Sequence, residues 1–116
     1  VVGSLGFEIA HVGINTENGE EALSVAGAFG QVFGFGVKDG NSSAFAGSGI
    51  EVMKSMYLGK SGHLAVRTNN IERAIAFLVK RGYGVDMETA KYKGKKMIAV
   101  YLKEEIGGFA VHLLQK

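Results

Sequence analysis

The sequence contains an internal repeat at an offset of 52 residues, and this repeat constrains the fold more than any other feature. The segment that begins at His11 aligns with the segment that begins at His63, and His, Thr, Asn, Glu and Ala recur at matched positions. Each copy continues with apolar residues at helical spacing and then with residues of alternating polarity. The repeat therefore predicts two modules of the form β-α-β-β-β.

The helix boundaries can be predicted in both modules. Asn18 and Asn70, or the threonines before them, are candidates to cap the helix N-termini, and Gly34 and Gly82 are candidates to end the helices. The apolar stripes of the two helices are Ala22, Val25, Ala26, Phe29 and Val32 in the first module, and Ala74, Ile75, Leu78 and Val79 in the second.

The predicted strands after the helices cover residues 36–38, 43–46 and 50–54 in the first module, and residues 85–91, 97–103 and 109–115 in the second. One module of this size cannot bury a sheet face alone. The 116-residue chain is therefore expected to form a single α+β domain over residues 1–116. In that domain, modules at about 7–55 and 61–116 share a concave centre.

The composition excludes several kinds of site and partner. The chain has no cysteine, which rules out disulfides, thiolate metal sites and cysteine nucleophiles. A net charge of +2 gives no support for nucleic-acid binding, and no apolar segment approaches the ~20 residues of a membrane span. In the absence of a signal peptide we expect a cytoplasmic protein. Because the sequence has no initial methionine, we expect a trimmed chain or a piece of a longer polypeptide.

All three histidines occupy positions related by the repeat. His11 and His63 open the predicted first strands, and His112 lies in the last predicted strand, where its counterpart in the first module is Glu51. A pseudo-twofold relation between the modules would let these four side chains converge. Three imidazoles and one carboxylate suit a divalent metal ion such as Zn, Ni, Co, Fe(II) or Mn.

The same pattern also describes a solvated sheet face. Glu51 lies between Ile50 and Val52, so alternation places it opposite its apolar neighbours whether it binds metal or water. The symmetry-related position of every histidine favours the metal site over the solvated face.

The chain resembles the vicinal oxygen chelate superfamily, which includes glyoxalases, bleomycin resistance proteins and dioxygenases. The segments that carry the resemblance are residues 11–14 (HVGI), 49–52 (GIEV), 62–66 (GHLAV) and 107–114 (GGFAVHLL). It implies the glyoxalase/bleomycin resistance fold, a curved mixed sheet of two βαβββ modules, and a homodimer. It also implies a metal bound by His11, Glu51, His63 and His112. Glyoxalase I normally has a glutamate at the last of these positions, so His112 departs from that pattern.

A more particular resemblance is to the C-terminal domain of some bacterial keto-deoxy-phosphogluconate aldolases. It is carried by residues 40–43, 49–55 and 107–109. This resemblance implies a fused or associated aldolase domain.

The superfamily resemblance implies that the ion acts as a Lewis acid on a small-molecule substrate with two adjacent oxygens, and that it stabilises an enediolate. A keto acid, a hydroxy acid or a hemithioacetal fits this description. Glu51 is the candidate catalytic base, and His112 could share this task because imidazole titrates near neutral pH. Arg67 is expected on the same sheet face as His63, where it binds a substrate carboxylate or forms a surface ion pair.

These observations support a divalent-metal-dependent glyoxalase-like lyase or isomerase. The alternative is a non-catalytic domain that binds a small ligand or regulates an attached aldolase, because a fold alone does not determine function. An extradiol dioxygenase with Fe(II) is a third hypothesis. It is less favoured, because those enzymes usually contain two two-module units and this chain contains one. The four lysines between residues 91 and 96 form either an anion-attracting loop or a solvated hairpin turn.

Overall fold

The computed structural model describes residues 2–116, so Val1, the first residue of the expected domain, lies outside the described residues. The elements follow the order α1 (Val2–Leu5), β1 (Glu8–Asn15), α2 (Gly19–Phe33), β2 (Val37–Asp39), β3 (Ser43–Ala46), β4 (Ile50–Met53), β5 (Gly62–Thr68), α3 (Ile71–Lys80), β6 (Val85–Lys93), β7 (Lys96–Leu102) and β8 (Phe109–Gln115). The predicted strands after both helices are present, and their bounds agree with the expected ones to within two residues.

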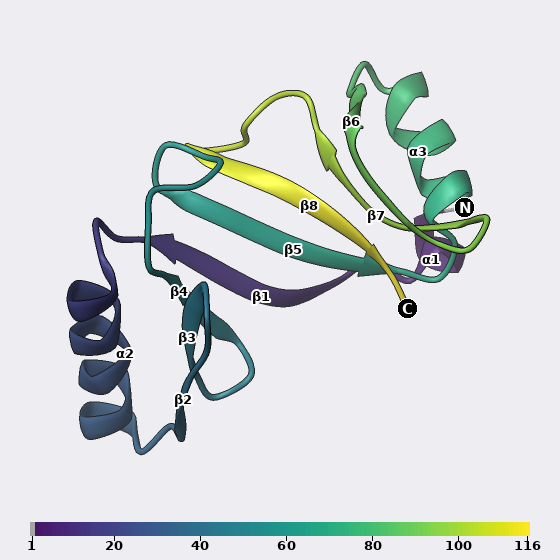
Figure 1. Ribbon diagram of the computed structural model, residues 1–116. Coiled ribbons are helices and arrows are strands. Elements are labelled where there is room, and N and C mark those ends of the chain that lie inside the picture. Colours follow the sequence, from purple (N-terminus) through teal and green to yellow (C-terminus); the bar gives the residue numbers. More distant parts are fainter. Residues whose placement is uncertain (1) are drawn as a thin grey trace.

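All eight strands belong to one sheet, in the order β2-β3-β4-β1-β5-β8-β7-β6. This order is symmetric about the β1–β5 pair. The strands β4, β3 and β2 follow β1 outward on one side, and their repeat counterparts β8, β7 and β6 follow β5 on the other. Strands β1 and β5 pair antiparallel at the centre, while β4 runs parallel to β1 and β8 runs parallel to β5. The two longer helices lie at opposite ends of this sheet (Figure 1). The predicted α+β class, with two βαβββ modules in one curved mixed sheet, is confirmed.

The predicted helix caps are also confirmed. The side chains of Asn18 and Asn70, rather than those of the threonines before them, each accept a backbone N–H from the first turn of the helix. Helix α2 ends at Gly34, whose φ of 76° lies in the left-handed region that favours glycine. Helix α3 ends at Arg81, and Gly82 follows with a φ of 90°.

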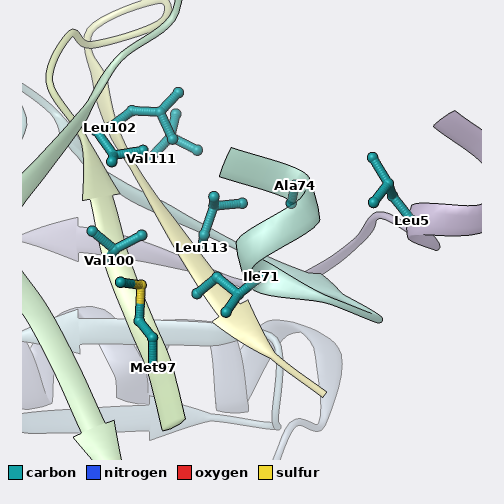
Figure 2. Close-up of a cluster of buried hydrophobic side chains, with 9 residues drawn as sticks. Leu5, Ile71, Ala74, Met97, Val100, Leu102, Val111 and Leu113 are labelled. Carbon is teal, nitrogen blue, oxygen red and sulfur yellow. The ribbon is translucent and has the colours of Figure 1, made fainter. Parts of the chain in front are cut away.

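Each module packs its helix against one face of its half of the sheet. The core of module 1 consists of Ala22, Ala26, Ala44, Ala46 and Val52. The core of module 2 is larger and consists of Leu5, Ile71, Ala74, Val85, Met97, Val100, Leu102, Val111 and Leu113 (Figure 2). Alternation along β4 and β8 then turns Glu51 and His112 toward the face of the sheet opposite the two module helices, α2 and α3.

Helix α1 was not predicted, because four residues are too few to show a helical period. Its last residue, Leu5, is buried in the core of module 2. The carbonyl of Leu5 accepts hydrogen bonds from the Thr68 hydroxyl at 2.7 Å and from the Asn69 backbone N–H at 2.8 Å. These contacts fasten the start of the chain to module 2.

The prediction that His11 opens its strand was wrong. Strand β1 begins at Glu8, because Glu8 and Ile9 extend the pairing by opposing Arg67 and Val66 of β5. His11 therefore lies in the middle of the strand. The helices within residues 2–116 are all too short or too polar to cross a membrane.

Candidate metal centre

The four central strands each carry one of the predicted ligands. In the sheet order β4-β1-β5-β8 these are Glu51, His11, His63 and His112. Gly13 of β1 is paired with Glu51 on one side and His63 on the other, while Ala65 is paired with His11 and His112. Cross-strand partners share a face, so the register places all four side chains on the same face of a single chain.

Three of the four side chains meet at one point. The Nε2 atoms of His11 and His63 lie 3.3 Å apart, and Glu51 Oε1 lies 3.3 Å from the first and 3.2 Å from the second. Three donors at this spacing suit an ion about 2.1 Å from each, the usual length of zinc bonds to histidine nitrogen and carboxylate oxygen. The residues therefore fit a divalent metal ion.

The two oxygens of Glu51 have different partners. Oε1 faces the two histidines, while Oε2 accepts a hydrogen bond of 2.7 Å from the Ser43 hydroxyl of the neighbouring strand β3. These contacts, first those with His11 and His63 and then that with Ser43, hold the pKa of Glu51 well below its usual range despite burial. Glu51 is therefore ionised and fixed with one oxygen pointing at the histidines.

The ring of His63 occupies space that exists only because residue 13 is glycine. A Cβ atom on Gly13 would lie 2.0 Å from Cε1 of the His63 ring. His63 is 3% exposed, and its Nδ1 atom has no hydrogen-bond partner within the described residues. Nε2 is the nitrogen of His63 that is placed to bind an ion, because it lies 3.3 Å from His11 Nε2 and 3.2 Å from Glu51 Oε1.

His112 is not part of this group of three. Its ring stacks on Tyr101 with a centroid distance of 4.1 Å and an interplanar angle of 2°, and its centroid is 6.4 Å from that of His63. Burial, followed by the positive charges of His63, His11 and Lys91, lowers the pKa of His112 to about 4. His112 is therefore neutral at pH 7 and lies beside the three converging donors.

One cavity of about 480 Å³ joins these side chains. It is lined by His11, Ser42, Glu51, Met53, Ser55, Tyr57, His63, Tyr101, His112 and Leu114. Burial and the neighbouring Tyr57 and Glu51 raise the pKa of Tyr101, so its hydroxyl stays protonated. The Asn15 amide donates to the carbonyls of Tyr57 and Gly59, at 3.2 and 3.1 Å, and so holds the loop that carries Tyr57 over the cavity.

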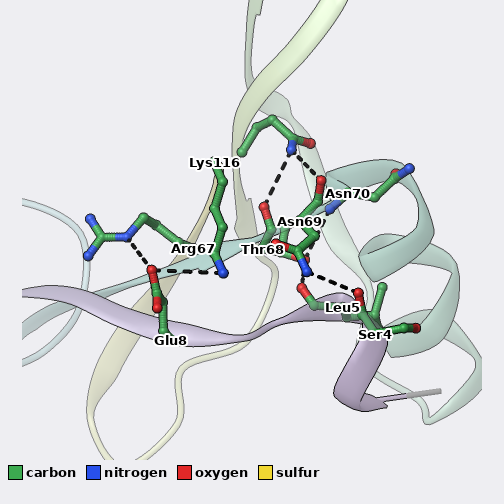
Figure 3. A network of polar contacts seen from close by, with 9 residues as sticks. Ser4, Leu5, Glu8, Arg67, Thr68, Asn69, Asn70 and Lys116 are labelled. Carbon is green, nitrogen blue, oxygen red and sulfur yellow. Dashed lines mark hydrogen bonds and ion pairs between the residues drawn. The ribbon is translucent and has the colours of Figure 1, made fainter.

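Arg67 lies on the expected face but is not brought to the cavity. It is four residues beyond His63 on β5, which is about 13 Å along a strand. Its Nε donates to Glu8 Oε1 at 3.1 Å, and Lys116 approaches the same carboxylate (Figure 3). The geometry is that of the surface ion pair, because alternation predicts the face of a residue but not its distance from the site.

Three contributors to the site were missed in the sequence. Gly13, Ser43 and Tyr101 act through contacts between strands, and such contacts depend on the pairing register. Only Gly13 carries a local signal, because it is the one glycine within strand β1 and a glycine inside a strand often marks a close approach by another group.

No family model and no curated protein matches the sequence. Solved structures do match over nearly the whole chain. Methylmalonyl-CoA epimerase from Mycobacterium tuberculosis is 16% identical with a TM-score of 0.64, over 92% of this chain and 86% of the epimerase. A methylmalonyl-CoA epimerase in complex with methylmalonyl-CoA is 15% identical with a TM-score of 0.64, over 97% and 96% of the two chains. A hypothetical protein from Bacillus halodurans is 14% identical with a TM-score of 0.61, over 95% and 94%.

At identities of 14–16%, the structural comparison establishes the fold and not the function. Together with the symmetric eight-stranded sheet, it shows that this chain has the glyoxalase/bleomycin resistance fold.

Proposed function

We propose that this protein is a metal-dependent isomerase or lyase that moves a proton on a small substrate with two adjacent oxygens. The observation that carries the proposal is the triangle of His11 Nε2, His63 Nε2 and Glu51 Oε1, whose edges are all 3.2–3.3 Å. A divalent ion held there would supply a Lewis acid that stabilises negative charge on a substrate oxygen.

In this proposal Glu51 serves as a ligand rather than as the base. Its Oε1 is directed at the two histidines and its Oε2 is held by Ser43, so moving a proton would require breaking one of these contacts. His112 lines the same cavity but lies outside the triangle. We therefore assign proton transfer to His112, which would take a proton from a substrate carbon and return it to the same or a neighbouring atom.

The charge of the site favours an anionic substrate. Two neutral imidazoles and one carboxylate around a dication leave one net positive charge, which attracts a carboxylate or an enediolate. Keto and hydroxy acids carry such groups. Two structural neighbours are methylmalonyl-CoA epimerases, which supports a proton-moving reaction next to a carbonyl.

A non-catalytic ligand-binding domain is the second candidate, because the triangle could hold an ion that only tethers a ligand. A cytoplasmic homodimer and a fused or associated aldolase domain remain predictions from the sequence. The structural neighbours described above, which are epimerases and a hypothetical protein, give no support for the aldolase resemblance.

Exchange of carbon-bound hydrogen in D₂O tests the catalytic proposal. The metal-loaded protein is incubated with a panel that includes a 2-hydroxy acid, the hemithioacetal of methylglyoxal with glutathione, and methylmalonyl-CoA. We expect NMR to show deuterium at the carbon next to the carbonyl of at least one compound. The rate should fall by at least about 100-fold in His112→Ala, the order of a lost general base.

Two controls complete this experiment. Protein stripped of metal should give no exchange above the buffer rate, and Arg67→Gln should exchange like the unaltered protein because Arg67 is paired with Glu8. If the metal-loaded protein binds members of the panel but exchanges none of them, the protein is a binding domain.

A further inference from the structure

Module 2 contains a second cavity of about 480 Å³, which is built from the start of α3, the turn between β6 and β7, and the end of β8. Among residues 2–116, none lines both this cavity and that of the proposed metal centre. Three lysines from the β6–β7 turn line the second cavity, and we call them the turn lysines: Lys93, Lys95 and Lys96. The cavity is therefore a separate feature with a concentration of positive charge.

The turn lysines are placed where they repel one another. Lys93 and Lys96 are cross-strand partners in the pairing of β6 with β7, and Lys95 lies in the two-residue turn between them. Like charges directly opposite each other destabilise a sheet. Exceptions of this kind to favourable local design are expected mainly at functional sites. The repulsion would be relieved by an anion bound between the ammonium groups.

The charge of the turn lysines is not neutralised by the protein. In the part of the chain that the structure describes, residues 2–116, no turn lysine forms an ion pair. A fourth lysine of the cavity, Lys116, lies 3.9 Å from the carboxylate of Glu8. Glu72 also lines the cavity and offsets one charge, so three unpaired lysines leave an excess of two positive charges.

The wall of the cavity before α3 is held by side-chain amides. Gln115 Oε1 accepts the backbone N–H of Ile71 at 2.8 Å, and Gln115 Nε2 donates to the carbonyl of Asn69 at 2.6 Å. The Asn69 side chain donates to the carbonyl of Ser4 at 3.1 Å (Figure 3). These contacts form the wall in advance, so a ligand does not have to order it on binding.

We propose that this cavity binds the phosphate group of a small molecule through the turn lysines. A phosphate carries close to two negative charges and three strong acceptor oxygens, which match the excess charge and the three ammonium groups. The Cβ atoms of cross-strand partners are about 5 Å apart, so Lys93 and Lys96 can contact one anion together. The volume of about 480 Å³ suits a small molecule, and the net charge of only +2 argues against a nucleic acid.

Titration with inorganic phosphate, followed by NMR, tests this proposal. The full chain is first freed of metal by dialysis, so that phosphate cannot bind through an ion at the metal centre. We expect saturable shifts of the backbone amides of residues 70–72 and 93–97, and none at His11 or His63. The double variant Lys93→Gln/Lys96→Gln should bind at least about tenfold more weakly, the order expected for lost charge-assisted hydrogen bonds.

Lys91→Gln is the matched control, because Lys91 belongs to the same hairpin but is paired with Ala99 and does not line this cavity. It should change the affinity by less than about twofold, since salt screens a charge outside the site. Urea denaturation without phosphate should find the double variant at least as stable as the unaltered protein, because a repelling pair has been removed. A loss of binding in the double variant then does not result from unfolding.

An alkyl phosphate distinguishes the sources of the phosphate group. Tighter binding than that of inorganic phosphate identifies an esterified ligand, whose alkyl part can pack on Ile98, a residue of the same cavity that is 38% exposed. Equal or weaker binding identifies free phosphate, and either result supports the site.

Three results would overturn the proposal. These are binding that does not saturate by about 10 mM phosphate, a tenfold excess over a millimolar Kd, unchanged affinity in the double variant, and an equal loss in Lys91→Gln. Because the titration is carried out without metal, each of these results leaves the proposed metal centre standing.

Discussion

The two modules follow the same path but differ in what fills them and in what they bring to the centre. The core of module 1 is built from four alanines and Val52, whereas the core of module 2 contains three valines and five larger apolar side chains beside Ala74. At the centre, Gly13 and Glu51 of module 1 correspond to Ala65 and His112 of module 2. The symmetry of the chain path therefore builds the sheet, while the departures from symmetry shape the site.

The largest expected effect concerns the two cores. Leu113→Ala removes a buried side chain that is 2% exposed and should lower the free energy of unfolding by about 3 kcal/mol or more. Val52→Ala removes two carbons from the smaller core and should cost about 2 kcal/mol. Urea denaturation of both variants checks this order. A greater loss in Val52→Ala would contradict the view that module 2 contributes the larger share of the core.

The second effect distinguishes His63 from His11 by how strongly each ring depends on the small residue opposite it in the sheet. Gly13→Ala places a methyl group where the ring of His63 lies, so the ring must move and the affinity for a divalent ion should fall by about 10- to 100-fold, the range seen when support for a ligand is lost. The reciprocal change, Ala65→Gly, only removes a methyl group near His11. We expect it to alter the affinity by less than about threefold.

Calorimetric titration with Zn²⁺ measures both variants, and circular dichroism establishes that each is folded. Equal losses in Gly13→Ala and Ala65→Gly would mean that the glycine is not what positions His63.

The third effect distinguishes His112 from Glu51, its counterpart in the repeat, by the pH range over which each residue contributes to stability. The folded-state pKa of His112 is about 4, below its usual 6.5, so the unfolded chain takes up a proton that the folded chain refuses between these values. Stability should therefore fall as the pH is lowered from about 6.5 to about 4. The pKa of Glu51 is also lowered, but from 4.5, so its contribution is present above pH 4.5 and is lost only below it.

Unfolding free energies of the unaltered protein, His112→Gln and Glu51→Gln at several pH values check this assignment. Between pH 6.5 and 4.5, His112→Gln should lose less stability than the unaltered protein, because glutamine takes up no proton on unfolding. His11 and His63 are present in both proteins, so the difference between the two slopes reports on residue 112. Glu51→Gln should differ in slope mainly below pH 4.5. An unchanged slope in His112→Gln would show that His112 is accessible to protons in the folded protein.

The sequence predicts the fold well because each signal is local or repeated. The caps at Asn18 and Asn70 and the symmetric sheet follow from helix spacing and from the offset between the copies. The convergence of His11 and His63 follows from the same repeat. Helix α1 was missed because it is short and is held by contacts with Thr68 and Asn69, which lie far along the chain.

The details of the site could not be predicted because they depend on register and packing. Spacing gives Arg67 and His63 the same face, yet it does not show that Glu8 lies opposite Arg67. The repeat matches His112 to Glu51, yet it does not show that the ring stacks on Tyr101. The lysines between residues 91 and 96 look like one cluster in the sequence, whereas the bulges in β6 and β7 separate Lys91 from the others.

The central claim is that His11, Glu51 and His63 hold one divalent ion between the two halves of a single chain. Zinc titration by calorimetry, combined with elemental analysis of the dialysed protein, tests it most directly when the unaltered protein is compared with Glu51→Gln and Arg67→Gln. We predict one ion per chain in the unaltered protein and in Arg67→Gln, and a loss of at least about 100-fold in affinity in Glu51→Gln, because a charged ligand is replaced by a neutral one. Failure of the unaltered protein to bind, or equal binding in Glu51→Gln, would contradict the account.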